Sequence, residues 1–315
     1  MAPKRVLIDC DPGIDDALNL FLAFASPGDV HVEAVTVVFG NVGLERTVGN
    51  ALALCELLDV DVPVYAGAPK ALLAPRVDAA EYHGDTGLGS VVLPPPSRAA
   101  APGRAVEQIV ERALARPGEL TVVATGAMTN LALALCVEPL LAGALAEIVV
   151  MAGSLGAGNT TPSAEFNAYA DPHALKIVLD CGAPVTMFGL DVTHQVIASP
   201  ARVQALRASG GLLATCAADL MTTFAEPYRQ IYGWDGAAVH DVCTAAYLID
   251  PTLFEVRAMP VEVDTGPGPG FGQTIGDVHG LSGAPANVHV ATGVDSDRFF
   301  ALFAERVTAF DAGRA

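Results

Sequence analysis

The sequence reads Asp9-Cys10-Asp11-Pro12-Gly13-Ile14-Asp15-Asp16-Ala17 near its start, which places four carboxylates within eight residues. The apolar segment directly before these acids, residues 6–8, predicts a buried strand, and the apolar residues 17–25 after them predict a buried helix. The acids therefore lie where a strand turns into a helix, at the carboxyl end of the strand. Open α/β sheets bind their ligands at such points.

Helix capping explains part of this acidic cluster. Asp11 can cap the helix, Pro12 suits its first position, and acids in the first turn favour the helix dipole. Capping accounts well for one or two acids and poorly for four, because like charges this close raise one another's pKa unless a cation neutralises them. Crowded oxygen ligands suit Ca²⁺ or Mg²⁺, and Ca²⁺ tolerates looser geometry. Zinc is disfavoured, since Cys10 is the only thiol or imidazole among the acids.

The composition indicates a globular protein with a large core. The chain has 315 residues, 52% hydrophobic and 17% charged, which is enough for one or two domains. Its net charge of −18 disfavours nucleic acid and anionic membrane surfaces as partners, although solubility alone also explains an acidic surface. We find no signal peptide and no apolar run of about 18 residues that would span a membrane. The six cysteines form no CxxC pair, so we expect reduced thiols and a cytoplasmic location.

Strand-like and helical segments alternate along most of the chain. Beyond the first strand and helix, strands are predicted at residues 32–38, 63–67, 120–124, 148–151, 185–188, 256–263 and 288–291. Helices are predicted at residues 44–58, 105–115, 130–135, 172–179, 200–230, 240–249 and 295–310. This alternation predicts an α/β fold with a parallel, doubly wound sheet, and no clear domain boundary interrupts it.

Two loops depart from this alternation and carry polar residues. The proline-rich residues 68–103 contain His83, and a loop this long in a compact protein is typical of a functional flap. The second loop leads into the helix at 172–179, and solvation alone would also explain its polar side chains, which are Asn159, Glu165, Asn167 and Asp171.

Several side chains lie at or just past the carboxyl ends of predicted strands. They are Asp11, Asn41, Thr125, Met151 and Asp191. If these strands are parallel, their carboxyl ends meet at one edge of the sheet. The residues alone thus predict an acidic, metal-binding pocket at that edge.

At this point the sequence resembles the inosine–uridine preferring nucleoside hydrolases, through an ordered series of motifs that covers nearly the whole chain. The motifs are Asp9 to Ala17, Gly40-Asn41, His83-Gly84, Thr125-Gly126 with Thr129-Asn130, Met151-Ala152-Gly153, Asn159, Glu165-Phe166-Asn167 with Asp171-Pro172, His240-Asp241, and Val294 to Phe299. The resemblance implies a single domain over residues 1–315 with an open, doubly wound, mostly parallel central sheet. It also implies a homodimer or homotetramer that hydrolyses the N-glycosidic bond of ribonucleosides to ribose and free base.

The resemblance further implies one Ca²⁺ ion at the floor of the pocket. Its ligands would be the carboxylates of Asp11, Asp15, Asp16 and Asp241 and the backbone carbonyl of Thr125. Ca²⁺ lowers the pKa of a bound water, and Asp11 as general base would take its proton during attack on C1′. The transition state would be oxocarbenium-like and stabilised by the surrounding carboxylates.

The family's substrate contacts can be carried over in the same way. The residues that would bind substrate are Asp15, Asn41, His83, Met151, Asn159, Glu165, Phe166, Asn167, Tyr228, Tyr232, His240 and Asp241. Within this set Asp15, Asp241, Asn159, Glu165 and Asn167 would hold the ribose hydroxyls, and Met151 would pack against the sugar. Binding of both ribose hydroxyls would explain a preference for ribose over 2′-deoxyribose.

His240 and several aromatic residues would form the end of the pocket that binds the base. His240 would assist departure of the base, since a histidine pKa suits proton donation near neutral pH, or would only order Asp241. Candidates for stacking on the base are His83, Phe166, Tyr228, Tyr232 and Trp234, and ordinary packing explains each about as well.

The sequence departs from the commonest family pattern at Ala127, at Ala152 and in residues 268–274, which affects fine geometry and base preference but no metal ligand. Two alternative activities stay open: hydrolysis of a modified nucleoside by the same mechanism, and an Mg²⁺-dependent phosphatase of the haloacid-dehalogenase type. That phosphatase needs a downstream lysine, and the chain has only Lys4, Lys70 and Lys176. A non-catalytic nucleoside binder is a third alternative, which nothing in the sequence supports.

Overall fold

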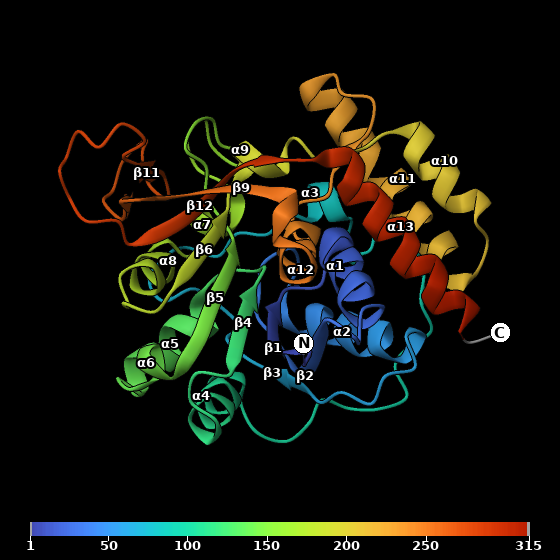
Figure 1. The fold of residues 1–315 in the computed structure, drawn as a ribbon, viewed down its shortest axis with the longest axis horizontal. Coiled ribbons are helices and arrows are strands. Elements are labelled where there is room, and N and C mark those ends of the chain that lie inside the picture. The colour runs from blue at the N-terminus through green and yellow to red at the C-terminus, as the bar shows by residue number, and fades with distance from the viewer. Residues whose placement is uncertain (1, 314–315) are drawn as a thin grey trace.

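The computed structural model describes residues 2–313, and one eight-stranded sheet runs through its centre (Figure 1). In spatial order its strands are β3 (Val64–Ala66), β2 (Val30–Val37), β1 (Lys4–Cys10), β4 (Leu120–Ala124), β5 (Leu145–Met151), β6 (Val185–Phe188), β12 (Val288–Val294) and β9 (Phe254–Met259). All neighbours pair in parallel except β12 and β9, which are antiparallel. This confirms the predicted mostly parallel sheet.

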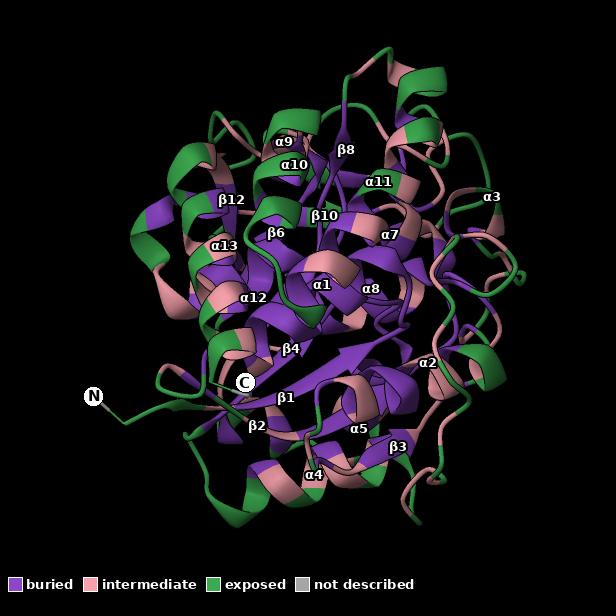
Figure 2. Ribbon diagram, turned by 90° about the vertical axis from the view of Figure 1, so that its right-hand side faces the viewer, coloured by how far each residue is buried: buried purple, intermediate pink, exposed green. Residues whose placement is uncertain are grey.

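Helices cover both faces of the sheet, as a doubly wound fold requires. One face carries α1 (Ile14–Phe24), α2 (Leu44–Leu57), α10 (Pro200–Ala208), α11 (Leu212–Tyr232), α12 (Val242–Ile249) and α13 (Ser296–Ala312). The other face carries α4 (Ala105–Ala115), α5 (Thr129–Val137), α6 (Leu141–Ala144) and α8 (Pro172–Leu179). Figure 2 shows the buried residues concentrated in the sheet between these two layers.

Short elements complete the chain. They are α3 (Ala80–His83), α7 (Phe166–Ala170), α9 (Leu190–Thr193), a 3₁₀ turn at Pro251–Leu253, and two small antiparallel sheets formed by β7 (Ile197–Ala198) with β8 (Ala237–Ala238) and by β10 (Val261–Val263) with β11 (Thr274–Gly276). Among residues 2–313, no helix is both long and apolar enough to cross a membrane.

The structure differs from the sequence prediction in two elements. The single strand predicted at 256–263 is divided at Pro260, so that β9 joins the central sheet and β10 pairs with β11. Proline has no N–H to donate to a strand ladder, which favours a break there. The helical segment predicted at 200–230 is two helices, since Gly210 and Gly211 between them adopt φ of 75° and 90°. Glycine reaches such positive φ without a steric penalty.

The long loop at 68–103 brings α3 over the carboxyl edge of the sheet. α3 lies against α11, and the Ser90 hydroxyl forms a hydrogen bond with that of Thr223 on α11. His83, at the end of α3, is buried with 5% of its surface exposed. The loop predicted to be a flap therefore delivers a buried histidine to the edge of the sheet where the acids lie.

Asn130 ties together the strand ends beneath this edge. Its side chain accepts a hydrogen bond from Ala68 N at 2.7 Å and donates to Asp9 Oδ1 at 2.8 Å and to the Val37 carbonyl at 3.2 Å. The Thr36 hydroxyl donates to the same Asp9 oxygen at 2.6 Å. One fully buried amide thus joins β1, β2, α5 and the start of the 68–103 loop.

We expect Asn130→Ala to lower the free energy of unfolding by about 2–4 kcal/mol, because it leaves several buried polar groups without partners. Urea unfolding followed by circular dichroism measures this loss. A variant within about 0.5 kcal/mol of the wild type, as for an ordinary surface substitution, would contradict the assigned role.

Candidate active site

Three carboxylates meet at the carboxyl end of the sheet. Asp15 and Asp16 stand in the first turn of α1, and Asp241 precedes the first residue of α12, which packs against α1. One oxygen from each carboxylate lies within 4.8 Å of the other two, and all three residues are buried. The fold therefore brings together acids more than 220 positions apart in the chain, as the sequence analysis expected.

These acids carry a large electrostatic penalty. Burial, and next the charge of Asp16, raises the pKa of Asp15 to about 8. Burial also raises the pKa of Asp16 and, well above its usual range, that of Asp241. Among the described residues, Asp241 Oδ2 has no hydrogen-bond partner. Buried, crowded and partly unpartnered carboxylates favour a neutralising cation, and an all-oxygen donor set fits a hard divalent ion.

Asp11 follows β1 directly and is fully buried. Its Oδ2 accepts a hydrogen bond from Asn41 N at 2.6 Å, whereas Oδ1 has no partner within residues 2–313. Gly40 and Gly126 enclose the carboxylate: a Cβ on Gly126 would lie 2.7 Å from Oδ1, and one on Gly40 would collide with Oδ2. Burial, and then the charge of Asp16, raises its pKa well above the usual range. One Asp11 oxygen thus stays free for a proton or a cation.

Polar side chains from other strand ends hold the acids in place. Asn41 donates to Asp16 Oδ2 at 3.0 Å, and the Thr125 hydroxyl donates to Asp16 Oδ1 at 2.8 Å. Asn167 donates to the carbonyls of Thr125, at 2.7 Å, and Met151, at 3.0 Å. A carbonyl oxygen has two lone pairs, so the Thr125 carbonyl can accept a second partner besides the hydrogen bond from Asn167.

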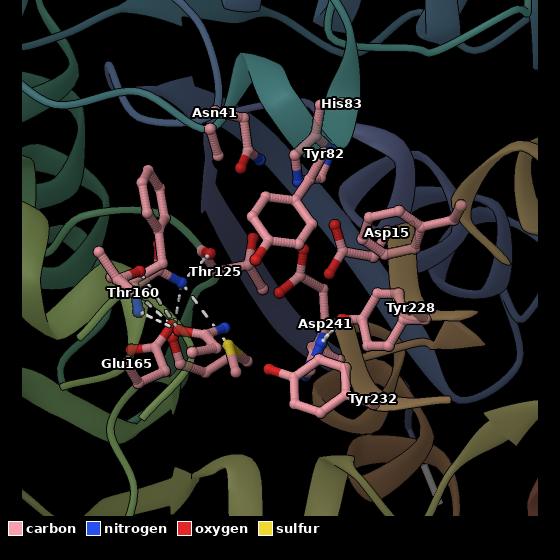
Figure 3. Close-up of a pocket in the computed structure, with 17 residues that line it drawn as sticks. Asp15, Asn41, Tyr82, His83, Thr125, Thr160, Glu165, Tyr228, Tyr232 and Asp241 are labelled. Atoms are coloured by element: carbon pink, nitrogen blue, oxygen red, sulfur yellow. Dashed lines mark hydrogen bonds between the residues drawn. The ribbon is translucent and has the colours of Figure 1, made fainter. Parts of the chain in front are cut away.

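A cavity that is partly open to solvent lies over these acids (Figure 3). Its lining consists of Asp15, Asn41, Ala79, Tyr82, His83, Thr125, Met151, Asn159, Thr160, Glu165, Phe166, Asn167, Phe224, Tyr228, Tyr232, His240 and Asp241. Except for the stacking candidate Trp234, every residue that the sequence analysis put forward as a substrate contact is in this set. Glu165 and Thr160 lie across the cavity from Tyr228 and Tyr232.

A few predicted residues lie outside the cavity lining. Asp11 and Asp16 are buried without lining it. Trp234 instead stacks on Tyr232, with ring centroids 4.6 Å apart. Asp191 accepts a hydrogen bond from Leu155 N at 2.6 Å, and Asp171 caps α8, so both have structural roles.

Four lining residues were not predicted: Ala79, Tyr82, Thr160 and Phe224. Tyr82 directly precedes His83, and Phe224 lies one helical turn before Tyr228, so proximity and helical spacing are signals that could have found these two. Nothing in the sequence distinguishes Ala79 or Thr160 from ordinary loop residues. None of the three lysines lines the cavity, which disfavours the phosphatase alternative.

The titratable groups around the cavity are strongly perturbed. Glu165 accepts hydrogen bonds from Gly153, Asn167 and Ala168 N–H groups, and burial raises its pKa to about 7. His83 Nδ1 accepts a hydrogen bond from Ile14 N at 3.1 Å, and burial lowers its pKa to about 3. Both shifts have the same physical cause, which is the burial of these side chains in the cavity wall.

Comparison with known proteins identifies the family of this chain. The family model described as inosine-uridine preferring nucleoside hydrolase matches residues 6–301. The pyrimidine-specific ribonucleoside hydrolase RihB of Escherichia coli O157:H7 is 38% identical over 310 residues, which cover 98% of this chain and 99% of that protein.

Solved structures give the same result. The purine-preferring ribonucleoside hydrolase from Gardnerella vaginalis superposes with a TM-score of 0.91 at 34% identity, covering 98% of this chain and 99% of the other. The inosine-guanosine nucleoside hydrolase (IG-NH) superposes with a TM-score of 0.87 at 28% identity, covering 96% and 98%. On its sequence and its fold, the chain belongs to the inosine-uridine preferring nucleoside hydrolase family.

Proposed function

We propose that this protein hydrolyses the N-glycosidic bond of ribonucleosides, purine, pyrimidine or both, with a bound Ca²⁺ ion. The observation that supports it most directly is the group of buried carboxylates at the floor of the cavity, two of which have an oxygen without a hydrogen-bond partner among residues 2–313. Asp11, Asp15, Asp16, Asp241 and the Thr125 carbonyl would hold the ion. A bound Ca²⁺ ion would act as a Lewis acid toward water and would bind the vicinal hydroxyls of the ribose.

Asp11 is the proposed general base. Its Oδ1 is buried, has no hydrogen-bond partner among residues 2–313 and is enclosed by Gly126, so it can accept a proton from the water that attacks C1′. Asn41 N on the other oxygen holds the carboxylate in one orientation. As the bond to the base breaks, positive charge develops on the ribose, and the nearby carboxylates stabilise it more than they stabilise the neutral substrate.

The ribose and the base would occupy opposite ends of the cavity. Asp15, Asn159, Glu165, Asn167 and Asp241 supply polar groups to the cavity wall, and we place the ribose hydroxyls on them, with Met151 and Asn41 beside the sugar. The proposed base contacts, His83, Phe166, Tyr228, Tyr232 and His240, supply aromatic faces for stacking. Relatives with pyrimidine-specific and purine-preferring names resemble this chain to similar degrees, so similarity does not decide its base preference.

We also propose a homodimer or homotetramer in the cytoplasm. The six cysteines are free and three of them are buried, which is consistent with reduced thiols. Light scattering coupled to size-exclusion chromatography measures the oligomeric state, and a monomer at micromolar concentration would contradict this part of the proposal.

Metal-replete protein should release ribose from ribonucleosides, and a chelator should abolish release, because the clustered carboxylates lose the cation that neutralises them. The measurement is reducing sugar from inosine, uridine, adenosine, guanosine, cytidine and thymidine, with and without chelator, followed by Ca²⁺ or Mg²⁺ restoration. Thymidine should be inert, since it lacks the 2′-hydroxyl. Folded, metal-replete protein that binds these nucleosides but releases no ribose would favour a modified nucleoside or a binding role.

His240→Ala should lose about 100-fold or more in kcat/KM on inosine and much less on 4-nitrophenyl riboside, whose leaving group departs without assistance. Steady-state kinetics on both substrates test this difference. Equal losses on the two substrates would remove His240 from leaving-group assistance and leave it only the ordering of Asp241.

A further inference from the structure

The hairpin formed by β10 and β11 lies at the outer edge of the molecule, and none of its residues, 261–276, lines the cavity (Figure 1). Its loop and the start of β11 include residues 268–274, where the sequence departs from the commonest family pattern. Thr274 is the first residue of β11 and is buried, with 2% of its surface exposed. A buried hydroxyl needs hydrogen-bond partners, and those of Thr274 lie in the loop that follows β5.

Thr274 forms two hydrogen bonds with the backbone of one residue in that loop. Its hydroxyl donates to Ser154 O at 2.7 Å and accepts from Ser154 N at 2.8 Å. Among residues 2–313, neither of these backbone groups has another hydrogen-bond partner. Ser154 is also buried, so without the hydroxyl of Thr274 a buried donor and a buried acceptor would lose their partners. Thr274 therefore fixes the backbone just past the end of β5.

This fixed backbone directs one N–H group at Glu165. Gly153 adopts a φ of 76°, and a Cβ on it would lie 2.6 Å from Oγ1 of Thr274, so Thr274 packs directly against Gly153. The Gly153 carbonyl accepts a hydrogen bond from Leu190 N at 2.9 Å, and the Gly153 N–H donates to Glu165 Oε2 at 2.7 Å. The backbone at Gly153 cannot rotate away from the carboxylate without breaking one of these contacts.

The hydrogen bond from Gly153 ties the Glu165 carboxylate to the central sheet. The other N–H groups that donate to this carboxylate, among them those of Asn167 and Ala168, belong to α7 and move with it, because Glu165 is the N-cap residue of α7. The Asn167 side chain also joins α7 to carbonyls at the ends of β4 and β5. Loss of the Gly153 bond should therefore turn the carboxylate without releasing the helix.

The loop of the hairpin also packs against α7. Phe271 meets Tyr169 of α7 edge-on, with ring centroids 5.7 Å apart, and a Cβ on Gly272 would lie 2.8 Å from the Tyr169 Cα. The Ser163 hydroxyl donates to Pro269 O at 3.2 Å. The hairpin thus contacts both the end of β5 and α7, the two parts of the fold that meet at the Glu165 carboxylate.

We propose that Thr274 is a positioning residue for the ribose: through the backbone of residues 153–154 it holds the Glu165 carboxylate where it can accept a hydrogen bond from one ribose hydroxyl. This inference rests on the proposed hydrolase function and on the ribose contact proposed there for Glu165, and it adds a residue outside the cavity. A buried acceptor in a fixed orientation rejects a substrate that lacks the matching hydroxyl, because the acceptor is then left without a partner. The hairpin therefore determines how strictly that hydroxyl is required.

The test compares inosine or uridine, whichever the wild type cleaves faster, with its 2′-, 3′- and 5′-deoxy analogues, as three ratios of kcat/KM for the parent over the analogue. Analogues cleaved too slowly to follow are measured as competitive inhibitors. Thr274→Val removes the hydroxyl and keeps the shape of the side chain. We expect it to lower one of the three ratios about 10-fold, the effect of one hydrogen bond to a charged group, and to leave the other two within about 2-fold of wild type. Glu165→Gln should lower the same ratio.

Three further variants complete the comparison. Thr274→Ser restores the hydroxyl and should recover the wild-type ratios. Thr186→Val is the matched control: the Thr186 hydroxyl is buried and donates to Glu147 Oε1 at 2.7 Å, and neither residue lines the cavity, so all three ratios should stay at the wild-type values. The double variant Glu165→Gln/Thr274→Val should be no less selective than Glu165→Gln alone, because both substitutions act on one interaction.

The outcomes separate failure of this inference from failure of the hydrolase function. If the wild type cleaves ribonucleosides, a Thr274→Val variant that lowers all three ratios equally, or none, would overturn the inference and leave the hydrolase function intact. So would a Glu165→Gln variant that lowers a different ratio. A wild type that cleaves no ribonucleoside would overturn the proposed function itself.

A milder substitution keeps the test available if circular dichroism shows that Thr274→Val does not fold. Phe271→Ala loosens the same hairpin at a half-buried ring that packs on α7. It should lower one of the three ratios by a smaller factor than expected for Thr274→Val, and three unchanged ratios would contradict the inference.

Discussion

Repulsion among buried carboxylates is the constraint on which the rest of this site depends. Asp11, Asp15, Asp16 and Asp241 are all buried, and burial raises the pKa of each. A fold tolerates such a group only if its backbone holds the acids firmly and a cation or protons balance their charge. The surrounding structure supplies the first requirement through the N–H of Asn41, the hydroxyl of Thr125 and the close approach of Gly40.

The parallel sheet makes this crowding possible. Each βα unit ends its strand at the same edge, so one short loop after β1, one after β2 and one after β4 each contribute a polar group to the same few ångströms. Beneath the acids, the side-chain amide of Asn130 joins β1, β2, α5 and the start of the 68–103 loop. The same architecture that concentrates charge at the floor of the cavity therefore also provides the hydrogen bonds that keep it rigid.

The cavity has two chemically different ends, and different parts of the fold supply them. The polar floor comes from the strand ends and from the loop that leads into α7, which are held by many hydrogen bonds. The aromatic end comes from α3 and the end of α11, which pack on one another through rings and few polar contacts. The acids belong to the polar part, where the hydrogen bonds of Asn41 and Thr125 hold them in place.

The sequence by itself determined the α/β architecture and the acidic edge of the sheet, because strand–helix alternation and the acids at 9–16 are local patterns. Most of the cavity residues were predicted through the family resemblance. It did not predict the division at Pro260, which depends on which strand each half can pair with. Nor did it predict Tyr82 and Phe224 in the cavity wall, or that His240 has both nitrogens occupied. Thr193 and Tyr228 lie 47 and 12 positions from His240, and only the packing of α9, α11 and α12 brings their hydroxyls to its ring. These contacts depend on how three helices pack against one another, which no local pattern in the sequence specifies, so the tertiary structure alone decides them.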